Sequence, residues 1–345
     1  MTARPLSLLD LTPIAPGHSA PQAIRNAVEL AQLAESLGYR RVWYAEHHNS
    51  PGLAAGSPEV MIAHVAAQTR HIRVGSGGVM LPNHAPLAVA ERFRLLECMY
   101  PGRIDLGLGR APGTDPRTAG ALRRAVQGAN GDDQPELVDD LLAFDEGTFP
   151  PGHPWAGIRP IPAESALPPI WLLGSSDYSA RLAAEMGLGF AFAAHINLEG
   201  ALRAMHDYRA RFRPSSRNAR PHAILALSVT VGETMDEADE LALIGDLVML
   251  RLRTGQPLLY PTLEEAKAFP FSREQRAALE SMGTRAFMGD AATVLEAVNA
   301  FADECAADEL MLTTRLADPA HRRMMVRNLA AAAAESAGIT PAAAD

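Results

Sequence analysis

A pair of adjacent histidines is the first group in this chain that could do acid–base chemistry. His47 and His48 follow the carboxylate of Glu46, at the end of an apolar run at 41–45. Imidazole changes protonation near neutral pH and can give or take a proton. Adjacent residues of an extended chain point to opposite sides, so the two rings can rarely bind one metal ion. The pattern predicts a proton-handling site without a metal, with structural packing of one histidine as the alternative.

Glycines lie within or directly after two other apolar runs. Gly77 and Gly78 fall in the run at 72–79, and Gly109 follows the run at 104–108. Glycine in a strand permits close approach of a ligand or an unusual peptide geometry, and it also fits a simple bulge. Arg110 comes next, and its planar guanidinium is suited to a phosphate. An exposed ion pair is the alternative for Arg110.

Small hydroxyl residues follow the apolar run at 170–173. Ser175, Ser176 and Ser179 lie where a helix is expected to begin, and free backbone N–H groups at a helix N-terminus form an anion site. Serine there is also a common helix cap. Because Arg110 would lie one strand away in a barrel, we interpret this segment as phosphate-binding.

These residues need a scaffold, and short apolar runs alternate with amphipathic helices along the chain. We expect strands at 6–11, 41–45, 72–79, 104–108, 170–173, 189–193, 223–231 and 309–313. We expect helices at 22–37, 58–69, 87–99, 126–144, 178–186, 198–212, 235–252, 291–305 and 319–336. Continuous apolar strands are typical of parallel strands buried on both faces. Eight repeats with no G-x-G-x-x-G after the first strand favour an α/β fold, a (β/α)8 TIM barrel, over an open doubly wound sheet.

Two stretches are less regular than the rest. They cover about 111–169, after the fourth strand, and 254–287, before the eighth. Both are too long for ordinary connections, so we expect insertions that act as lids or line the site. The whole chain, 1–345, is expected to be a single barrel domain.

Composition limits the partners and the compartment. The net charge is −9 and no run is rich in lysine or arginine, which argues against nucleic acid or an anionic membrane as a partner. No window approaches the ~20 apolar residues of a membrane span, and no signal peptide is visible. The two cysteines, Cys98 and Cys305, form no pair motif. We therefore expect a cytoplasmic protein in a reducing compartment.

Three segments resemble the bacterial luciferase-like monooxygenase family. They are AEHHN at 45–49, GSGGVMLPNHAPLAVAERFRLLECMYPGRIDLGLGRAPGTD at 75–115, and WLLGSSDYSARLAAEMGLGFAFAAHI at 171–196. The resemblance extends over about residues 5–315 and is strongest in the central segment. Within the family, the chain is more similar to the FMN-dependent oxidoreductases than to the light-emitting luciferases.

The resemblance implies roles for individual residues. His47 matches the family's proton-handling histidine beside the flavin, and His48 its neighbour. Gly77 and Gly78 match a non-prolyl cis peptide that packs against the isoalloxazine. The matching flavin-phosphate contacts are Arg110, Ser175, Ser176 and Ser179.

Two departures from luciferase bear on the activity. Gly109 stands where luciferase carries a reactive cysteine, and Ser175 stands where it carries an acidic residue. Light emission is therefore not expected, while flavin binding still is.

The resemblance implies a monooxygenase that uses reduced FMN and O2 to oxidise a small organic substrate. His47 would be the acid/base and His48 would orient it or the substrate. We expect a separate flavin reductase as partner and a homodimer formed through 58–99. A deazaflavin-dependent hydride transferase of the same fold and a non-catalytic flavin-binding protein are the alternatives. Candidate pocket residues are Leu11, Trp43, Met80, His195 and Asn197.

Overall fold

Eight parallel strands close into a barrel in the computed structural model, which describes residues 4–122 and 133–338. The ring consists of β1 (Leu6–Asp10), β2 (Arg41–Tyr44), β3 (Arg73–Ser76), β5 (Ile104–Gly109), β6 (Ile170–Gly174), β7 (Gly189–Ala193), β8 (Ala223–Ser228) and β11 (Glu309–Thr313). Pairing of β1 with β11 and of β3 with β5 completes the ring. The TIM barrel predicted from the sequence is confirmed.

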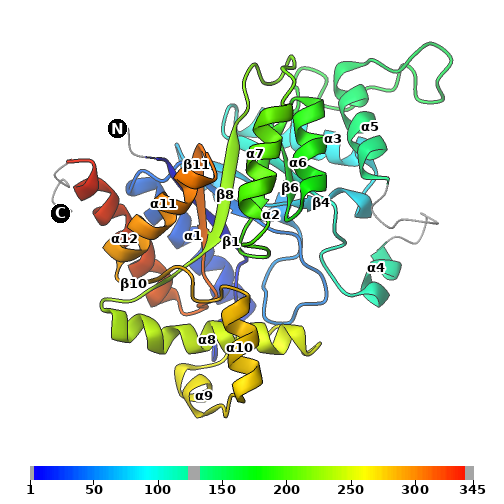
Figure 1. The fold of residues 1–345 in the computed structure, drawn as a ribbon. Coiled ribbons are helices and arrows are strands. Elements are labelled where there is room, and N and C mark those ends of the chain that lie inside the picture. The colour runs from blue at the N-terminus through cyan, green and yellow to red at the C-terminus, as the bar shows by residue number, and fades with distance from the viewer. Residues whose placement is uncertain (1–3, 123–132, 339–345) are drawn as a thin grey trace.

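Helices cover the outside of this ring (Figure 1). They are α1 (Ala20–Ser36), α2 (Pro58–Ala66), α3 (Pro86–Met99), α4 (Pro116–Leu122), α5 (Gln134–Glu146), α6 (Asp177–Met186), α7 (Ala201–Arg211), α8 (Met235–Arg253), α9 (Leu263–Ala268), α10 (Arg273–Ser281), α11 (Ala291–Glu304) and α12 (Pro319–Ser336), with a short 3-10 turn η1 (Leu81–Asn83). None of the helices in the described ranges is long and apolar enough to cross a membrane.

Alternation along the strands divides the core in two. Outward-facing residues such as Leu8, Val42 and Leu172 pack with the helices in one large apolar cluster. Inward-facing residues, including Leu9, Trp43 and Trp171, fill the barrel interior. Successive side chains of a strand point to opposite faces, so strands with apolar residues at every position are what a barrel covered by helices requires.

A buried ionic cluster fills the barrel where the strands begin. Arg41 pairs with Asp105 at 2.7 Å and with Glu309 at 2.8 Å, and Ser7 donates to Glu309 at 2.5 Å. The Arg41 guanidinium also lies 4.9 Å from the Trp171 ring centroid. Since every member is paired, the cluster satisfies its own charges and seals this end of the barrel.

Two predicted strands are broken, which corrects the sequence expectation. The run 72–79 splits into β3 and β4 (Val79–Met80) at a cis peptide between Gly77 and Gly78, as the family resemblance implied. Gly77 N donates to Tyr44 O at 2.7 Å, and Gly78 O accepts from Glu46 N at 3.1 Å. The run 223–231 splits into β8 and β9 (Thr230–Val231), because β9 leaves the ring to pair with β10 (Met288–Gly289).

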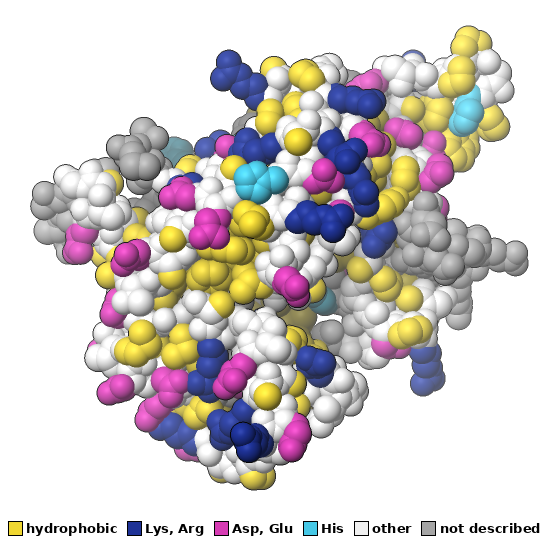
Figure 2. All heavy atoms as spheres, in the orientation of Figure 1, with side chains coloured by type: hydrophobic (Ala, Val, Ile, Leu, Met, Phe, Trp, Pro, Cys, Tyr) yellow, Lys and Arg dark blue, Asp and Glu magenta, His cyan; other side chains and the backbone are white. Residues whose placement is uncertain are grey.

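The stretch at 254–287 is not irregular throughout, since it contains α9 and α10. Both begin at side-chain caps, with Thr262 accepting from Glu265 N and Ser272 from Gln275 N. Figure 1 shows α8, α9 and α10 grouped at the bottom of the view. Acidic and basic side chains are interspersed over this group in Figure 2. Lys267 of α9 pairs with Glu240 of α8 at 2.6 Å.

The helix expected at 126–144 differs at its start. The described helix α5 begins at Gln134 and ends at Glu146, and Gly147 follows in the left-handed conformation. The predicted start at Val126 lies outside the described residues. An additional short helix, α4, precedes it in the same insertion.

Candidate active site

The carboxylate of Glu46 is the centre of a polar network at the end of β2. It accepts hydrogen bonds from Met80 N at 2.8 Å, His48 Nε2 at 2.8 Å, Asn83 Nδ2 at 2.9 Å and His84 Nε2 at 2.9 Å. Burial alone would raise the pKa of Glu46, but the hydrogen bonds from His84, Asn83 and His48 lower it. Glu46 is therefore an ionised group that fixes the loops after β2 and β4.

The two predicted histidines are placed differently. His48 is turned toward Glu46, while His47 is half-buried and its Nδ1 is buried with no hydrogen-bond partner among the described residues. Burial and the neighbouring charge of His48 lower the pKa of His47. His47 is thus a neutral imidazole with an unused ring nitrogen, as a proton-transfer group requires.

His84 and Asn83 were not identified as site residues from the sequence. They follow β4 directly, in the turn η1 and just after it, and both contact Glu46. Their signal was a polar Asn-His pair after an apolar strand, the same signal that identified His47. They were missed because we expected one continuous strand to Val79 and did not expect the turn that follows β4 to belong to the site.

The predicted glycines lie where a side chain has no room. A Cβ on Gly78 would be 2.8 Å from Gly107 O, a backbone atom that cannot move aside cheaply. A Cβ on Gly109 would be 2.6 Å from Met80 Sδ. Gly78 therefore allows the backbones after β3 and in β5 to pack closely, and Gly109 makes room for the side chain of Met80.

Arg110 and the serines lie on adjacent strands, after β5 and β6. The Arg110 guanidinium lies 4.4 Å from the centroid of the Tyr178 ring in the first turn of α6 and makes no ion pair among the described residues. Ser176 is the N-cap of α6, but its side chain makes no capping hydrogen bond. Unpaired backbone N–H groups and an unpaired cation together form an anion-binding notch.

The other two serines differ in how open they are to a ligand. Ser179 is 3% exposed, and a Cβ on Gly174 would lie 2.3 Å from its Oγ. Ser175 is half-buried, and its carbonyl accepts from Asn197 Nδ2 at 2.9 Å. The hydroxyls of Ser176 and Ser175, both half-buried, are therefore more open to an anion than that of the buried Ser179.

Candidate pocket residues are placed unevenly. Trp43 is fully buried, and its Nε1 donates to Asp105 Oδ2 at 3.2 Å, so it belongs to the barrel interior and not to a pocket. His195 is half-buried at the end of β7, and its Nδ1 lies 3.3 Å from Ala226 O. Burial lowers its pKa to about 4; the hydrogen bond with Ala226 O opposes this shift, and the charges of Arg315 and His47 add to it. His195 is therefore neutral at pH 7.

The segment after α8 packs over the loop that carries the histidines. A Cβ on Gly52 would lie 2.4 Å from Leu258 O, so the two backbones are in contact. The loop after β5 closes the other side, where His48 N donates to Gly113 O at 3.1 Å. Both predicted insertions thus contribute residues that touch the loop after β2.

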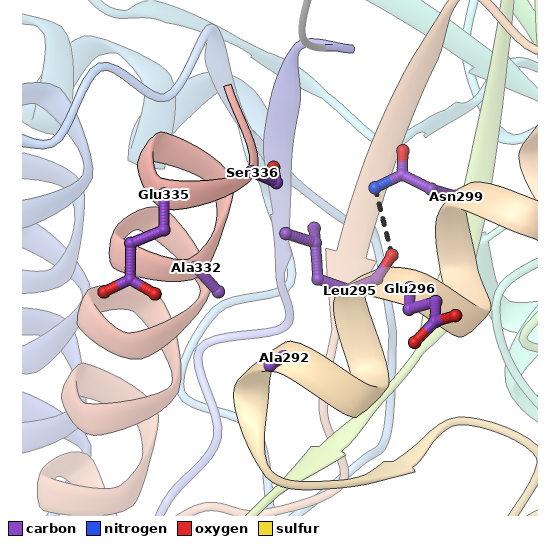
Figure 3. A pocket seen from close by; sticks show the side chains of 7 residues that line it. All are labelled: Ala292, Leu295, Glu296, Asn299, Ala332, Glu335 and Ser336. Carbon is purple, nitrogen blue, oxygen red and sulfur yellow. Dashed lines mark hydrogen bonds between the residues drawn. The ribbon is translucent and has the colours of Figure 1, made fainter. Parts of the chain in front are cut away.

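A hollow of about 400 Å³ lies elsewhere, between α11 and α12 (Figure 3). Leu295, Glu296 and Asn299 line one side, and Ala332 and Glu335 the other. A neighbouring hollow shares Leu295 and Asn299 and includes residues that precede β1 and β11. These hollows are therefore at the end of the barrel opposite the histidines.

Comparison with known proteins adds close relatives. The luciferase-like monooxygenase family matches residues 5–308. A luciferase-like monooxygenase of Escherichia coli K12 is 41% identical over 313 residues, covering 90% of this chain and 92% of that protein. The N-acetyl-S-alkylcysteine monooxygenase of Bacillus subtilis is 38% identical over 270 residues, covering 76% and 78%.

Solved structures share the fold. The crystal structure of apo-MsnO8 superposes with a TM-score of 0.87 at 34% identity, covering 98% of this chain and 100% of that one. More distant structures carry the fold alone. They include a type II Baeyer–Villiger monooxygenase of Pseudomonas putida in complex with FMN (TM-score 0.69, 22% identity, covering 95% and 97%) and an F420-dependent secondary alcohol dehydrogenase (0.60, 15%, covering 96% and 99%).

Proposed function

Since this chain belongs to the luciferase-like monooxygenase family, an oxidoreductase family, we propose that it uses reduced FMN and O2 to oxidise a small organic substrate. The observation that carries the choice of a flavin phosphate is the notch formed by Arg110 and the N-terminus of α6. Both follow hydrogen-bonded neighbouring strands at the same end of the barrel as His47.

The chain's residues fit such a cofactor. Arg110 and the uncapped N–H groups after Ser176 would hold the phosphate. Arg110 stacks on Tyr178 but makes no ion pair among the described residues, and the Ser176 side chain does not cap the helix, so both offer hydrogen-bond donors to an anion. Gly77, Gly78 and Gly109 carry no side chain at the ends of β3 and β5, where the flavin ring would lie. Bound in its reduced form, FMN supplies two electrons with which O2 is split, one atom entering the substrate and the other leaving as water.

Proton handling falls to His47. Its buried Nδ1 has no partner among the described residues, and its lowered pKa keeps the ring neutral and able to take a proton. His48 is held against Glu46 at 2.8 Å, so we assign it a positioning role. The contact between Gly52 and Leu258 keeps a segment of the second insertion over this loop, where it would exclude water.

Several partners follow from the same proposal. Reduced FMN would come from a separate flavin reductase, as we expected from the sequence. We also propose a homodimer through α2 and α3, which expose Val60, Leu95 and Met99.

Cys98 is exposed and unpaired, which suits the reducing cytoplasm that we expect.

The test has a binding arm and a turnover arm. Equilibrium dialysis of the full chain against FMN, riboflavin and F420 should give the highest affinity for FMN, and Arg110→Ala should remove the preference for FMN over riboflavin. With a flavin reductase, NADH and isotopically labelled oxygen, a panel of ketones and thioethers, including N-acetyl-S-methylcysteine, should yield products that contain one labelled atom. His47→Ala should retain FMN binding and lose oxygenation.

Other outcomes would reject the proposal. Hydride transfer with reduced F420 and no incorporation of oxygen would support the deazaflavin enzyme. Flavin binding without turnover on any panel compound, with His47→Ala indistinguishable from the parent, would support a non-catalytic flavin-binding protein.

A further inference from the structure

Arg315 is a half-buried cation at the mouth of the barrel with no acidic partner. It lies two residues after the end of β11, and its Nη2 donates to the main-chain oxygen of His195 at 3.3 Å. Within residues 4–122 and 133–338 it makes no ion pair. A guanidinium carries five N–H donors, so most of its donor capacity is unused.

The nearby carboxylates do not pair with Arg315. Asp246 accepts from Thr284 Oγ1 at 3.0 Å and from Arg285 Nη2 at 2.7 Å. Asp10 pairs with Arg322 at 2.7 Å through Oδ1, and its buried Oδ2 has no partner among the described residues. Burial lowers the pKa of Arg315, and the negative charge of Asp246 only partly offsets this. Keeping a desolvated cation without a bonded anion is costly, and a bound anion would remove that cost.

The position of Arg315 separates it from the proposed phosphate notch. In the order of the ring, β5 is the fourth strand and β11 the eighth, so Arg110 and Arg315 follow strands on opposite sides of the barrel. His47 and His195 follow the second and sixth strands, across the other diameter. A cofactor phosphate at Arg110 would leave Arg315 free for a second anion, with the imidazoles between them.

The groups around Arg315 are suited to a small anion. Tyr260 lies close enough to Arg315 for the two groups to interact, and burial raises the pKa of Tyr260 to about 12, so its hydroxyl keeps its proton and brings no negative charge. His195 is neutral and brings no second charge. Gly245 of α8 faces the stem of Arg315, since a Cβ there would lie 3.5 Å from Arg315 Cδ. One cation with a planar fork matches a carboxylate better than a dianion.

We propose that Arg315 is the anion subsite for the substrate, and that the substrate of this enzyme is therefore a small organic carboxylate. The inference rests on the proposed function, because it places the substrate at the barrel mouth across from the cofactor. Two parallel N–H···O bonds from the guanidinium would fix one end of the substrate. The other end would then lie toward His47.

The test compares charged and uncharged probes of equal shape. Aliphatic carboxylates from acetate to octanoate, each beside its methyl ester, are titrated into the full chain with saturating FMN, and binding is followed by saturation-transfer NMR. Carboxylates should bind more tightly than their esters. Arg315→Met should weaken carboxylate binding about ten- to a hundredfold and leave ester binding unchanged. Arg315→Lys should retain part of the preference, because the charge remains without the fork.

Controls separate this inference from the proposed function. Arg251→Met removes a half-buried arginine of α8 that pairs with Glu265 away from Arg315, and it should change the binding of neither probe. FMN affinity and the circular dichroism spectrum of Arg315→Met should match the parent. If no carboxylate binds better than its ester, or if Arg315→Met weakens both equally, the inference is wrong although FMN still binds. If Arg315→Met lowers FMN affinity as Arg110→Ala does, the arginine binds the cofactor instead. If the parent chain does not bind FMN, the proposed function itself is refuted.

Discussion

Replacing Glu46 with glutamine tests whether its carboxylate organises the site. Four N–H donors point at this one group, two at each oxygen. In Glu46→Gln the amide nitrogen takes the place of one oxygen. Each oxygen is bonded by one histidine and one other donor, Asn83 Nδ2 at Oε1 and Met80 N at Oε2. The histidine can change tautomer and accept from the new amide, so one donor, Asn83 Nδ2 or Met80 N, loses its acceptor.

The expected loss of stability follows from that count. A hydrogen bond to a charged group contributes about 1.5–3 kcal/mol, and one is lost while the others now go to a neutral amide. Part of this cost is offset because the variant no longer buries a charge. We therefore expect Glu46→Gln to lower the free energy of unfolding by about 1–3 kcal/mol near pH 7. Urea unfolding followed by tryptophan fluorescence measures the difference, and hydrogen exchange at the Met80 amide should accelerate.

The pH dependence has a definite sign. The folded-state pKa of Glu46 is lowered from its usual 4.5, so its stabilisation is fully present above pH 4.5. It is lost as the pH falls through the lowered folded-state pKa, when the carboxylate takes up a proton. The difference between parent and variant should therefore be constant above about pH 5.5 and narrow in acid.

A matched control uses an exposed glutamate. Glu29 pairs with Arg323 at 3.4 Å on the surface, and Glu29→Gln should change stability by less than about 1 kcal/mol. A loss for Glu46→Gln no larger than that of this control would refute the network as we describe it. So would a difference that grows as the pH falls.

Three further predictions concern single residues. Arg110→Ala should lower affinity for FMN about ten- to a hundredfold but leave affinity for riboflavin unchanged, as measured by equilibrium dialysis. Gly107→Ala would place a Cβ 2.1 Å from Ser76 O and should destabilise the chain by about 1–3 kcal/mol in urea unfolding. In the control Gly120→Ala the added Cβ meets no atom within 4 Å, so this variant should be neutral or more stable by about 0.5–1 kcal/mol. Equal changes in unfolding free energy for Gly107→Ala and Gly120→Ala would contradict this account. The folded-state pKa of His195 is lowered from 6.5 to about 4, so stability should fall as the pH drops from 6.5 to 4, and NMR titration of its imidazole should give a midpoint near the lower value.

The barrel and the ends of its strands could be predicted from the sequence, because each functional segment follows an apolar run. His47, Arg110 and Ser176 come directly after such runs, and parallel strands place their carboxyl ends at one side of a barrel. The cis peptide at Gly77 came from the family resemblance, since glycine pairs alone also fit a bulge.

Other features depend on contacts between distant segments. The partners of Glu46 include His84, which reaches it from the turn after a break that no periodicity signals. Trp43 faces inward as alternation requires, but the direction of its indole is set by Asp105 on another strand. The isolation of Arg315 follows from the bonds that Asp246 forms with Arg285, and no local pattern records those bonds.

The ionic cluster at the beginning of the strands has a consequence for assembly of the chain. Arg41 lies on β2, the second strand of the ring, and Glu309 lies on β11, the last strand. The two side chains nevertheless form an ion pair at 2.8 Å in the barrel interior. A fragment that ended before β11 would enclose Arg41 with half of its counter-charge missing. Half-barrels of this chain should therefore gain little by folding alone, and closure of the ring should be a cooperative, whole-chain event.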